Sequence, residues 1–196
     1  MMAADAEYGP NLRARITPLM TGVGPAEAGV VAAGALARLE LTENRPDLVI
    51  CLGSAGSARL DQGAVYQVSS VSYRDMDASP LGFPKGVTPL SDLPPEIALP
   101  QVPGLPAGRL ATGASVVSGD AYRGIDADMV DMETWAILRA CQQHDLPLIG
   151  LRGISDGAAP LKGITCWTDL LPVLDAHLAT ALDTVAGALQ ADQIAL

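Results

Sequence analysis

The sequence predicts a single α/β domain over residues 1–196, with a central, mostly parallel mixed sheet flanked by helices. Three observations favour this class. Short apolar runs, typical of buried parallel strands, occupy residues 47–52 and 147–156. Stretches of helical length and apolar periodicity occupy residues 25–41 and 168–190. Glycine-rich turns stand where the strands should end.

The first elements are expected in the order strand, helix, strand. Residues 3–8 resemble the end of a strand that runs into a helix, so we expect a truncated first strand. A modest strand is predicted over residues 12–20. The turn at residues 21–25 then places Pro25 at the first position of the helix that ends near residue 41.

Two further strands surround a proline-rich segment. Alternating residues predict a long strand over residues 65–73, and a returning strand is expected over residues 109–117. Residues 79–106 hold eight of the fifteen prolines, which predicts an irregular surface excursion that adds no strand.

Composition limits the function. The formal net charge is −10, which argues against nucleic-acid and anionic-membrane partners because phosphate groups are bound by clustered Lys and Arg. The three cysteines are far apart, so neither a zinc site nor a disulfide framework is indicated. The start lacks a signal-peptide pattern, and no apolar run approaches the roughly 20 residues that span a bilayer. We expect a cytoplasmic protein.

Ionisable residues stand at the predicted strand ends. Arg152 lies inside the apolar run 147–156, Asp156 ends it, and Glu133 ends the preceding element. Ligands of open α/β sheets bind beyond the carboxyl ends of the strands. The pattern therefore predicts a site for general-acid chemistry on a small polar molecule. The alternative is structural: a buried ion pair of Arg152 with one carboxylate, and a helix N-cap.

Seven short segments, in order, resemble those of the nucleoside phosphorylase superfamily, and within it the methylthioadenosine/S-adenosylhomocysteine nucleosidases. They are Glu7, Thr21–Gly24, Gly53–Gly56, Tyr73–Asp77, Val117–Asp120, Val130–Glu133 and Arg152–Asp156. The resemblance implies hydrolysis of a 5′-modified adenine nucleoside (methylthioadenosine, S-adenosylhomocysteine or 5′-deoxyadenosine) to adenine and free sugar.

The resemblance also implies the catalytic roles. Asp156 would be the general acid that protonates N7 of the purine, and burial would hold it protonated near neutral pH. Glu133 would accept hydrogen bonds from the ribose hydroxyls. Glu7 would orient and deprotonate the attacking water, with Arg152 and Ser54 helping to hold it.

Further substrate contacts are implied in the same way. Met132 would lie against the sugar, Tyr122 would stack on the base, and backbone groups near Tyr122 and Arg123 would recognise the adenine edge. The pocket for the 5′ substituent would include Leu81, Phe83 and Trp167. The remaining substrate-site residues would be Ala55, Gly56, Asp131 and Ser155. The family implies no metal, no cofactor, and a homodimer in which the neighbouring subunit completes the 5′ pocket.

Two other functions remain open. A nucleoside phosphorylase of this superfamily would carry an arginine just before its Gly-Ser segment, whereas this chain has Cys51 there and Glu7 available for water. Hydrolysis is therefore favoured over phosphorolysis. A nucleoside-binding protein without catalysis would have no reason to keep Glu7, Glu133, Arg152 and Asp156 together.

Overall fold

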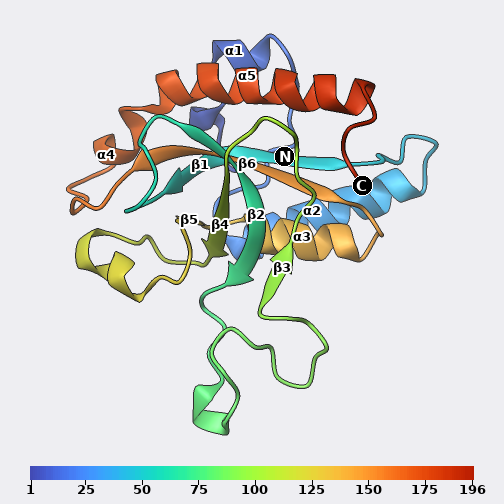
Figure 1. Ribbon diagram of the computed structural model, residues 1–196. Helices are drawn as coiled ribbons and strands as arrows, with labels where there is room; N and C mark the ends of the chain where they lie inside the picture. Colours follow the sequence, from blue (N-terminus) through green and yellow to red (C-terminus); the bar gives the residue numbers. More distant parts are fainter.

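The computed structural model describes residues 1–196 and shows a six-stranded mixed sheet that closes into a barrel (Figure 1). The strands are β1 (Val49–Gly56), β2 (Val65–Tyr73), β3 (Glu96–Ala98), β4 (Ala107–Thr112), β5 (Met129–Asp131) and β6 (Leu148–Asp156). Their order is β3-β2-β4-β5-β1-β6. An additional pairing, in which β2 runs antiparallel to β6, closes the sheet.

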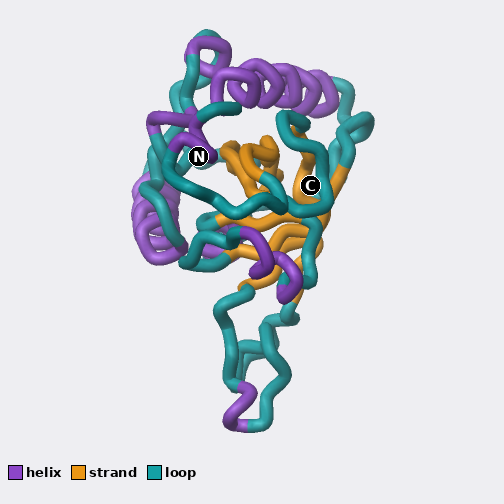
Figure 2. The backbone as a smooth tube through the Cα atoms, turned by 90° about the vertical axis from the view of Figure 1, so that its left-hand side faces the viewer, coloured by secondary structure: helices purple, strands orange, loops and turns teal.

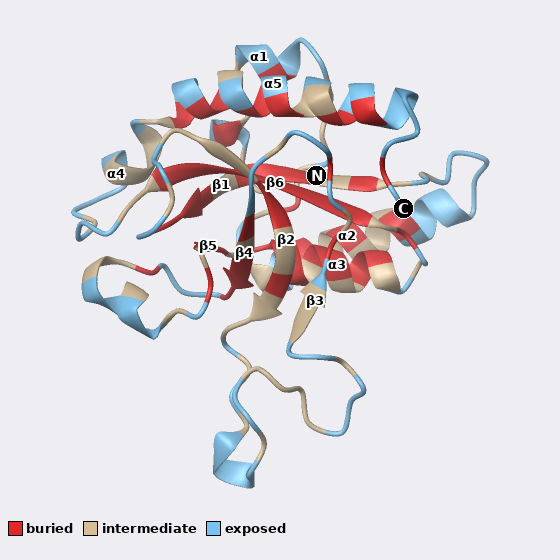
Figure 3. Ribbon diagram, viewed as in Figure 1, coloured by how far each residue is buried: buried red, intermediate tan, exposed pale blue.

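Helices cover two sides of the barrel. They are α1 (Pro10–Arg13), α2 (Pro25–Glu40), α3 (Thr134–Gln142), α4 (Thr165–Thr168) and α5 (Leu171–Gln190). Short 3-10 helices are η1 (Asp5–Glu7), η2 (Ser79–Leu81) and η3 (Gly119–Gly124). In Figure 3, α5 turns its buried face toward the strands from one side, and α2 and α3 pack together on the other.

Two apolar clusters hold these layers together. One joins α2 and α3 to the barrel through residues such as Leu36, Val49 and Ile137. The other joins α5 to the barrel through residues such as Ile149 and Leu174. Each side of the sheet therefore excludes water over a separate core. No helix is both long enough and apolar enough to cross a membrane.

Most of the predicted core elements are confirmed. The helix expected over residues 25–41 is α2, and the strand expected over residues 65–73 is β2. The two apolar runs form β1 and β6, which pair in parallel from Val49 and Leu148 onward. Gly53–Gly56 were expected to follow the first of these strands, whereas β1 includes them.

The strand predicted over residues 12–20 is wrong. Pro10 starts the short helix α1, and the carboxylate of Asp175, from α5, accepts the backbone N–H groups of Asn11 and Leu12 at 2.8 and 3.0 Å. A cap contributed by a distant helix overrode the local strand pattern. Within that range only Met20 makes a β-bridge, with Met2.

In place of the expected truncated first strand, the structure has only this isolated bridge. The N–H of Met2 donates to the carbonyl of Leu19 at 3.0 Å, and the carbonyl of Met1 accepts the N–H of Leu52 at 2.9 Å. Met1 and Met2 thus lie between β1 and the segment before α2. The chain then enters η1, which carries Glu7.

Two element boundaries and one added strand also differ from the predictions. β4 ends at Thr112 rather than at residue 117, because the chain turns and the N–H of Ala114 donates to the Asp75 carboxylate. The proline-rich segment does add a strand, β3, at the edge of the sheet, where prolines are tolerated. The closing helix α5 begins at Leu171 rather than residue 168.

The segment between β2 and β3 projects away from the barrel as a long loop that carries η2 (Figures 1 and 2). The prediction of an irregular surface excursion is confirmed for this part of the chain. Its apolar residues Leu81 and Leu90 are exposed.

Candidate active site

A cavity of about 520 Å³ collects most of the residues singled out from the sequence. Those that line it are Glu7, Ser54, Ala55, Gly56, Tyr122, Asp131, Met132, Glu133, Ser155, Asp156 and Trp167. They come from η1, the ends of β1, β5 and β6, the loop before α3, η3 and α4. Segments far apart in the chain thus meet at one place, where strand ends leave room for a ligand.

Four of the expected residues lie elsewhere. Arg152 is buried behind the cavity wall and does not line it. Arg123 is exposed and pairs with Asp120 at 2.9 Å. Leu81, 76% exposed, and Phe83 belong to the projecting excursion and do not reach the cavity of their own chain.

Several wall residues were not expected from the sequence. Besides the expected set, the cavity is lined by Ala3, Ala4, Val23, Arg74, Ser115, Val116, Val117, Val130, Leu161, Gly163 and Ile164. Four of them, Val23, Arg74, Val117 and Val130, lie inside segments that carry the family resemblance, so the sequence held a usable signal for them. The other apolar wall residues had no such signal because any surface loop can carry them.

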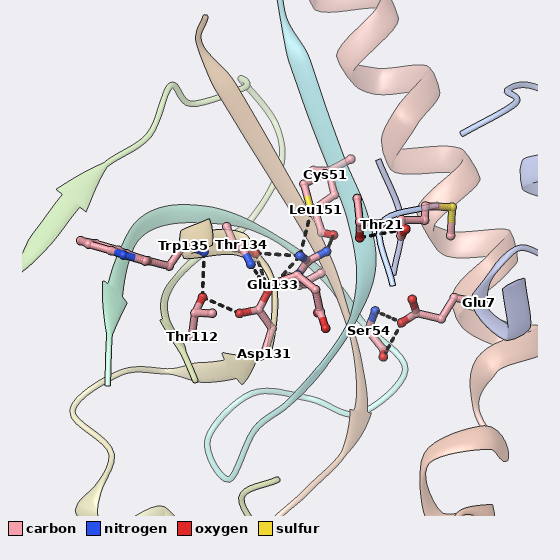
Figure 4. Close-up of polar contacts among 12 residues, drawn as sticks. Glu7, Thr21, Cys51, Ser54, Thr112, Asp131, Glu133, Thr134, Trp135 and Leu151 are labelled. Atoms are coloured by element: carbon pink, nitrogen blue, oxygen red, sulfur yellow. Dashed lines mark hydrogen bonds and ion pairs between the residues drawn. The ribbon is translucent and has the colours of Figure 1, made fainter. Parts of the chain in front are cut away.

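Glu7 is held in place by Ser54 (Figure 4). The Glu7 side chain is buried, with 6% of the residue exposed. Its Oε1 accepts hydrogen bonds from the backbone N–H and the hydroxyl of Ser54, both at 2.6 Å. Its Oε2 is buried and has no hydrogen-bond partner. A buried carboxylate oxygen without a donor is costly, so this atom is suited to a ligand or a water molecule.

The hydroxyl of Ser54 has a second neighbour. The indole N–H of Trp167, from α4, donates to Ser54 Oγ at 2.8 Å. Trp167 therefore contributes a polar contact as well as an apolar surface to the cavity wall.

Glu133 is positioned by the glycine turn before α2. Its Oε1 accepts the backbone N–H of Gly24 at 2.8 Å. Gly24 has a φ of 95°, a conformation that favours glycine because a side chain would be strained there. The side chain of Glu133 does not cap α3. Burial, reinforced by the nearby negative charge of Asp131, raises the pKa of Glu133 to about 7.

Asp131, which lines the cavity, forms a buried ion pair with Arg152 behind the cavity wall. The distance from Arg152 Nη2 to Asp131 Oδ2 is 2.9 Å, and the same nitrogen donates to the hydroxyl of Thr134 at 2.7 Å and to the sulfur of Cys51 at 3.0 Å. Asp131 also accepts the hydroxyl of Thr112 at 2.6 Å and the backbone N–H of Thr134 at 3.0 Å (Figure 4).

This network contains both features of the structural alternative, namely a buried ion pair of Arg152 with one carboxylate and a cap at the start of a helix. The pair neutralises Arg152 inside the sheet, and Asp131 satisfies a free N–H at the start of α3. Asp156 is not the partner of Arg152, so its carboxylate remains available to the cavity.

Asp156 lies at the end of β6, next to two hydroxyl groups. Its Oδ1 accepts the Ser155 hydroxyl at 2.7 Å, and its Oδ2 lies 3.3 Å from the Tyr122 hydroxyl, which donates to it. Burial and the charge of Asp156 raise the pKa of Tyr122 above its ordinary value, so this hydroxyl remains a donor at neutral pH.

Gly56 makes this approach possible. It is the β1 residue paired with Asp156, and a Cβ there would lie 2.3 Å from the Tyr122 hydroxyl and 2.7 Å from Asp156 Oδ2. Any side chain would displace one of these groups.

Comparison with known proteins identifies the family of this chain. Residues 10–169 match the family model described as the phosphorylase superfamily. A 5′-methylthioadenosine/S-adenosylhomocysteine nucleosidase of Haemophilus influenzae (strain PittEE) is 34% identical over 174 residues, covering 79% of this chain and 73% of the relative. The chain belongs to this nucleosidase family. A second such relative, from strain PittGG, is 33% identical over 158 residues and covers 71% of this chain and 67% of the relative.

Solved structures share the fold of this chain. The nucleosidase of Neisseria meningitidis in complex with methylthio-immucillin-A has a TM-score of 0.77 and 21% identity, covering 94% of this chain and 96% of that one. The futalosine hydrolase of Helicobacter pylori has a TM-score of 0.78 and 18% identity, covering 95% of each chain. The barrel with flanking helices is therefore a fold that this chain shares with both enzymes.

Proposed function

We propose that this protein hydrolyses the N-glycosidic bond of a 5′-modified adenine nucleoside, releasing adenine and a free sugar. One observation carries the proposal: a carboxylate with a free, buried oxygen, Glu7, lines the same cavity as Asp156 and Glu133. Hydrolysis of this bond requires a base that activates water, a group that stabilises the sugar, and an acid that protonates the leaving purine. Family membership supports the same reaction class.

Asp156 is the proposed general acid. The purine must leave as a neutral base, so a proton has to reach its N7 as the glycosidic bond breaks. The Ser155 hydroxyl orients Asp156 through Oδ1, and the longer 3.3 Å contact of Oδ2 with Tyr122 leaves that oxygen free to turn toward the base.

Glu133 is the proposed ribose ligand. The Gly24 N–H occupies Oε1, and no contact occupies Oε2, so one oxygen remains to accept ribose hydroxyl hydrogens. A negative charge there stabilises the positive charge that develops on the sugar in the transition state. Met132, the preceding residue, supplies an apolar surface for the sugar.

Glu7 is the proposed base that takes a proton from water. Ser54 fixes Oε1, which leaves Oε2 as the acceptor for the water hydrogen. Arg152 acts indirectly in this proposal, because its guanidinium is bound to Asp131, Thr134 and Cys51 rather than to Glu7.

Phosphorolysis is less well supported by the same contacts. A phosphate nucleophile needs cationic groups beside the sugar. Cys51 is buried and faces Arg152, whose charge Asp131 already neutralises. The one arginine that lines the cavity, Arg74, donates to the hydroxyl of Ser115 at 2.9 Å and pairs with Asp75 at 3.3 Å.

A panel of nucleosides, with and without phosphate, tests the proposal. Methylthioadenosine, S-adenosylhomocysteine and 5′-deoxyadenosine should each be examined for adenine release and for the form of the sugar product. We expect phosphate-independent release and a free sugar. A sugar 1-phosphate as the main product would establish the phosphorylase, and binding without turnover of any nucleoside would establish the non-catalytic alternative.

We also infer a homodimer in which the projecting excursion reaches the partner's site. Two apolar residues that line the cavity, Val116 and Ile164, are exposed to solvent. Leu81 and Phe83 of the excursion do not line the cavity of their own chain. Sedimentation equilibrium of wild type and Leu81→Asp tests this arrangement. A fully active wild-type monomer would contradict it. A single domain over residues 1–196 and a cytoplasmic location belong to the same proposal.

A further inference from the structure

We propose that Trp167 is a positioning residue for the water-activating carboxylate Glu7, and that it acts through the hydroxyl of Ser54. The inference rests on the proposed hydrolysis. It goes beyond a role for Trp167 as an apolar wall of the 5′ pocket, because it assigns a task to the indole N–H.

The hydrogen-bond inventory at Ser54 determines the direction of each bond. A serine hydroxyl has one hydrogen to donate, whereas an indole N–H can only donate. Ser54 Oγ has two polar neighbours, Trp167 Nε1 at 2.8 Å and Glu7 Oε1 at 2.6 Å. The hydroxyl must therefore accept from Trp167 and give its only hydrogen to Glu7.

The consequence is an asymmetric carboxylate. Oε1 of Glu7 receives two donors from Ser54, the backbone N–H and the hydroxyl, while the buried Oε2 receives none. Without Trp167, the Ser54 hydroxyl could rotate its hydrogen toward water or substrate, and Glu7 could then turn. Accepting a bond from Trp167 also makes the hydroxyl a stronger donor to Glu7.

The chemical step uses this asymmetry. The oxygen of water forms a bond to C1′ of the sugar while the bond from C1′ to the purine nitrogen breaks, and its electron pair passes to the purine. One proton of the water passes to Glu7 Oε2, and the purine takes its proton from Asp156. A carboxylate that keeps one oxygen facing the water is already oriented for proton transfer, which lowers the entropic part of the barrier.

The position of Trp167 suits this task. It lies in α4, between β6 and α5 in the chain, and its ring packs against the apolar cluster that joins α5 to the barrel. The indole is thereby held by packing on one side while its N–H points to Ser54. A phenylalanine at residue 167 would fill much of the same space without the N–H.

Steady-state kinetics on a cleaved nucleoside separates the N–H from the ring. We expect Trp167→Phe to lower kcat about tenfold while KM changes by less than about threefold, since one hydrogen bond that orients the base is lost. Trp167→Leu should lower kcat similarly and raise KM as well, because the wall is also lost. Thr165→Ala, at the exposed first residue of α4, controls for disturbance of that helix and should leave both constants unchanged.

Non-additivity is the second kinetic test. If Trp167 acts through Ser54, then Trp167→Phe should lower kcat by a much smaller factor in a Ser54→Ala background than in the wild type. A Trp167→Phe variant with wild-type kcat, or equal losses in the two backgrounds, would overturn the proposal.

The indole N–H signals test the coupling without any activity. The chain has two tryptophans, so proton–nitrogen NMR spectra should show two indole signals, and Trp167→Phe identifies one of them. We expect Ser54→Ala and Glu7→Gln each to move the Trp167 signal and to leave that of Trp135, which stacks on Tyr73, in place. If the chemical shift of the Trp167 signal is unchanged in both variants, the inference is overturned. If no nucleoside of the panel is cleaved, the proposed function fails, and these spectra still decide whether the three residues are coupled.

Discussion

Asp131 and Arg152 are joined 2.9 Å apart, and their side chains are only 1% and 2% exposed. The pair links β5 to β6 at the cavity wall, and the same aspartate binds Thr112 of β4 and the first residue of α3. A buried ion pair has a large desolvation cost, so removing one partner leaves an uncompensated charge inside the protein.

Asp131→Asn should therefore destabilise the protein by about 3–5 kcal/mol, because Arg152 keeps its charge and loses its counter-ion. Urea unfolding measures this change. The matched control is Asp183→Asn, which breaks the 2.8 Å pair of Asp183 with Arg15 on the surface, where solvent screens the charges and little loss of stability is expected. Similar small losses in both variants would show that the buried pair has little influence on stability.

Glu133→Gln should change how stability depends on pH. The pKa of Glu133 is raised from 4.5 to about 7, so the folded state binds its proton more tightly than the unfolded state does. The stability this confers is complete below about pH 4.5 and is lost as pH rises through about 7. The glutamine side chain would have no proton to lose. As pH rises from about 5 to 8, the free energy of unfolding of the variant should therefore increase relative to that of the wild type, by at most about 3 kcal/mol.

Melting temperatures of the two proteins across this pH range test that expectation. A constant difference between them would mean that Glu133 has an ordinary pKa. The same variant should turn over substrate far more slowly near neutral pH, since the sugar's developing charge loses its negative partner. Unchanged turnover would remove Glu133 from the site.

Gly56→Ala should reduce turnover by roughly tenfold or more, because the new Cβ would lie 2.7 Å from Asp156 Oδ2 and 2.3 Å from the Tyr122 hydroxyl. Displacing a reacting group by about 1 Å is enough for a loss of this size. Gly124→Ala is the matched control, since a Cβ there meets nothing within 4 Å. Kinetics of both variants decide the matter, and an active Gly56→Ala enzyme would mean that the acid tolerates displacement.

Asp156→Asn should separate binding from chemistry. An asparagine can still accept from Ser155, and Arg152 does not depend on Asp156, so stability should barely change. The amide has no proton to transfer, so turnover should fall by roughly 10² or more while an adenine-containing ligand still binds. Calorimetry for binding and adenine release for turnover give the two readouts. A folded variant with near-normal turnover would exclude Asp156 as the acid.

The amino-acid sequence alone determined the elements whose signals are local. A glycine-proline start and apolar periodicity sufficed for α2, and alternation over nine residues sufficed for β2. An apolar run ending in a carboxylate marked β6 and its exit, because side-chain period and strand length are properties of a short stretch of chain.

Tertiary structure decided every pairing that makes the site. Which carboxylate neutralises Arg152 depends on Asp131 lying across from it, 21 residues away in the chain, and the Glu7–Ser54 and Ser54–Trp167 bonds join residues 47 and 113 apart. The same holds for α1, where Asp175 of α5 caps the helix that replaces the strand expected over residues 12–20. Hydrogen bonds reach only about 3 Å, so their partners follow from strand register and helix packing, which local sequence patterns do not contain.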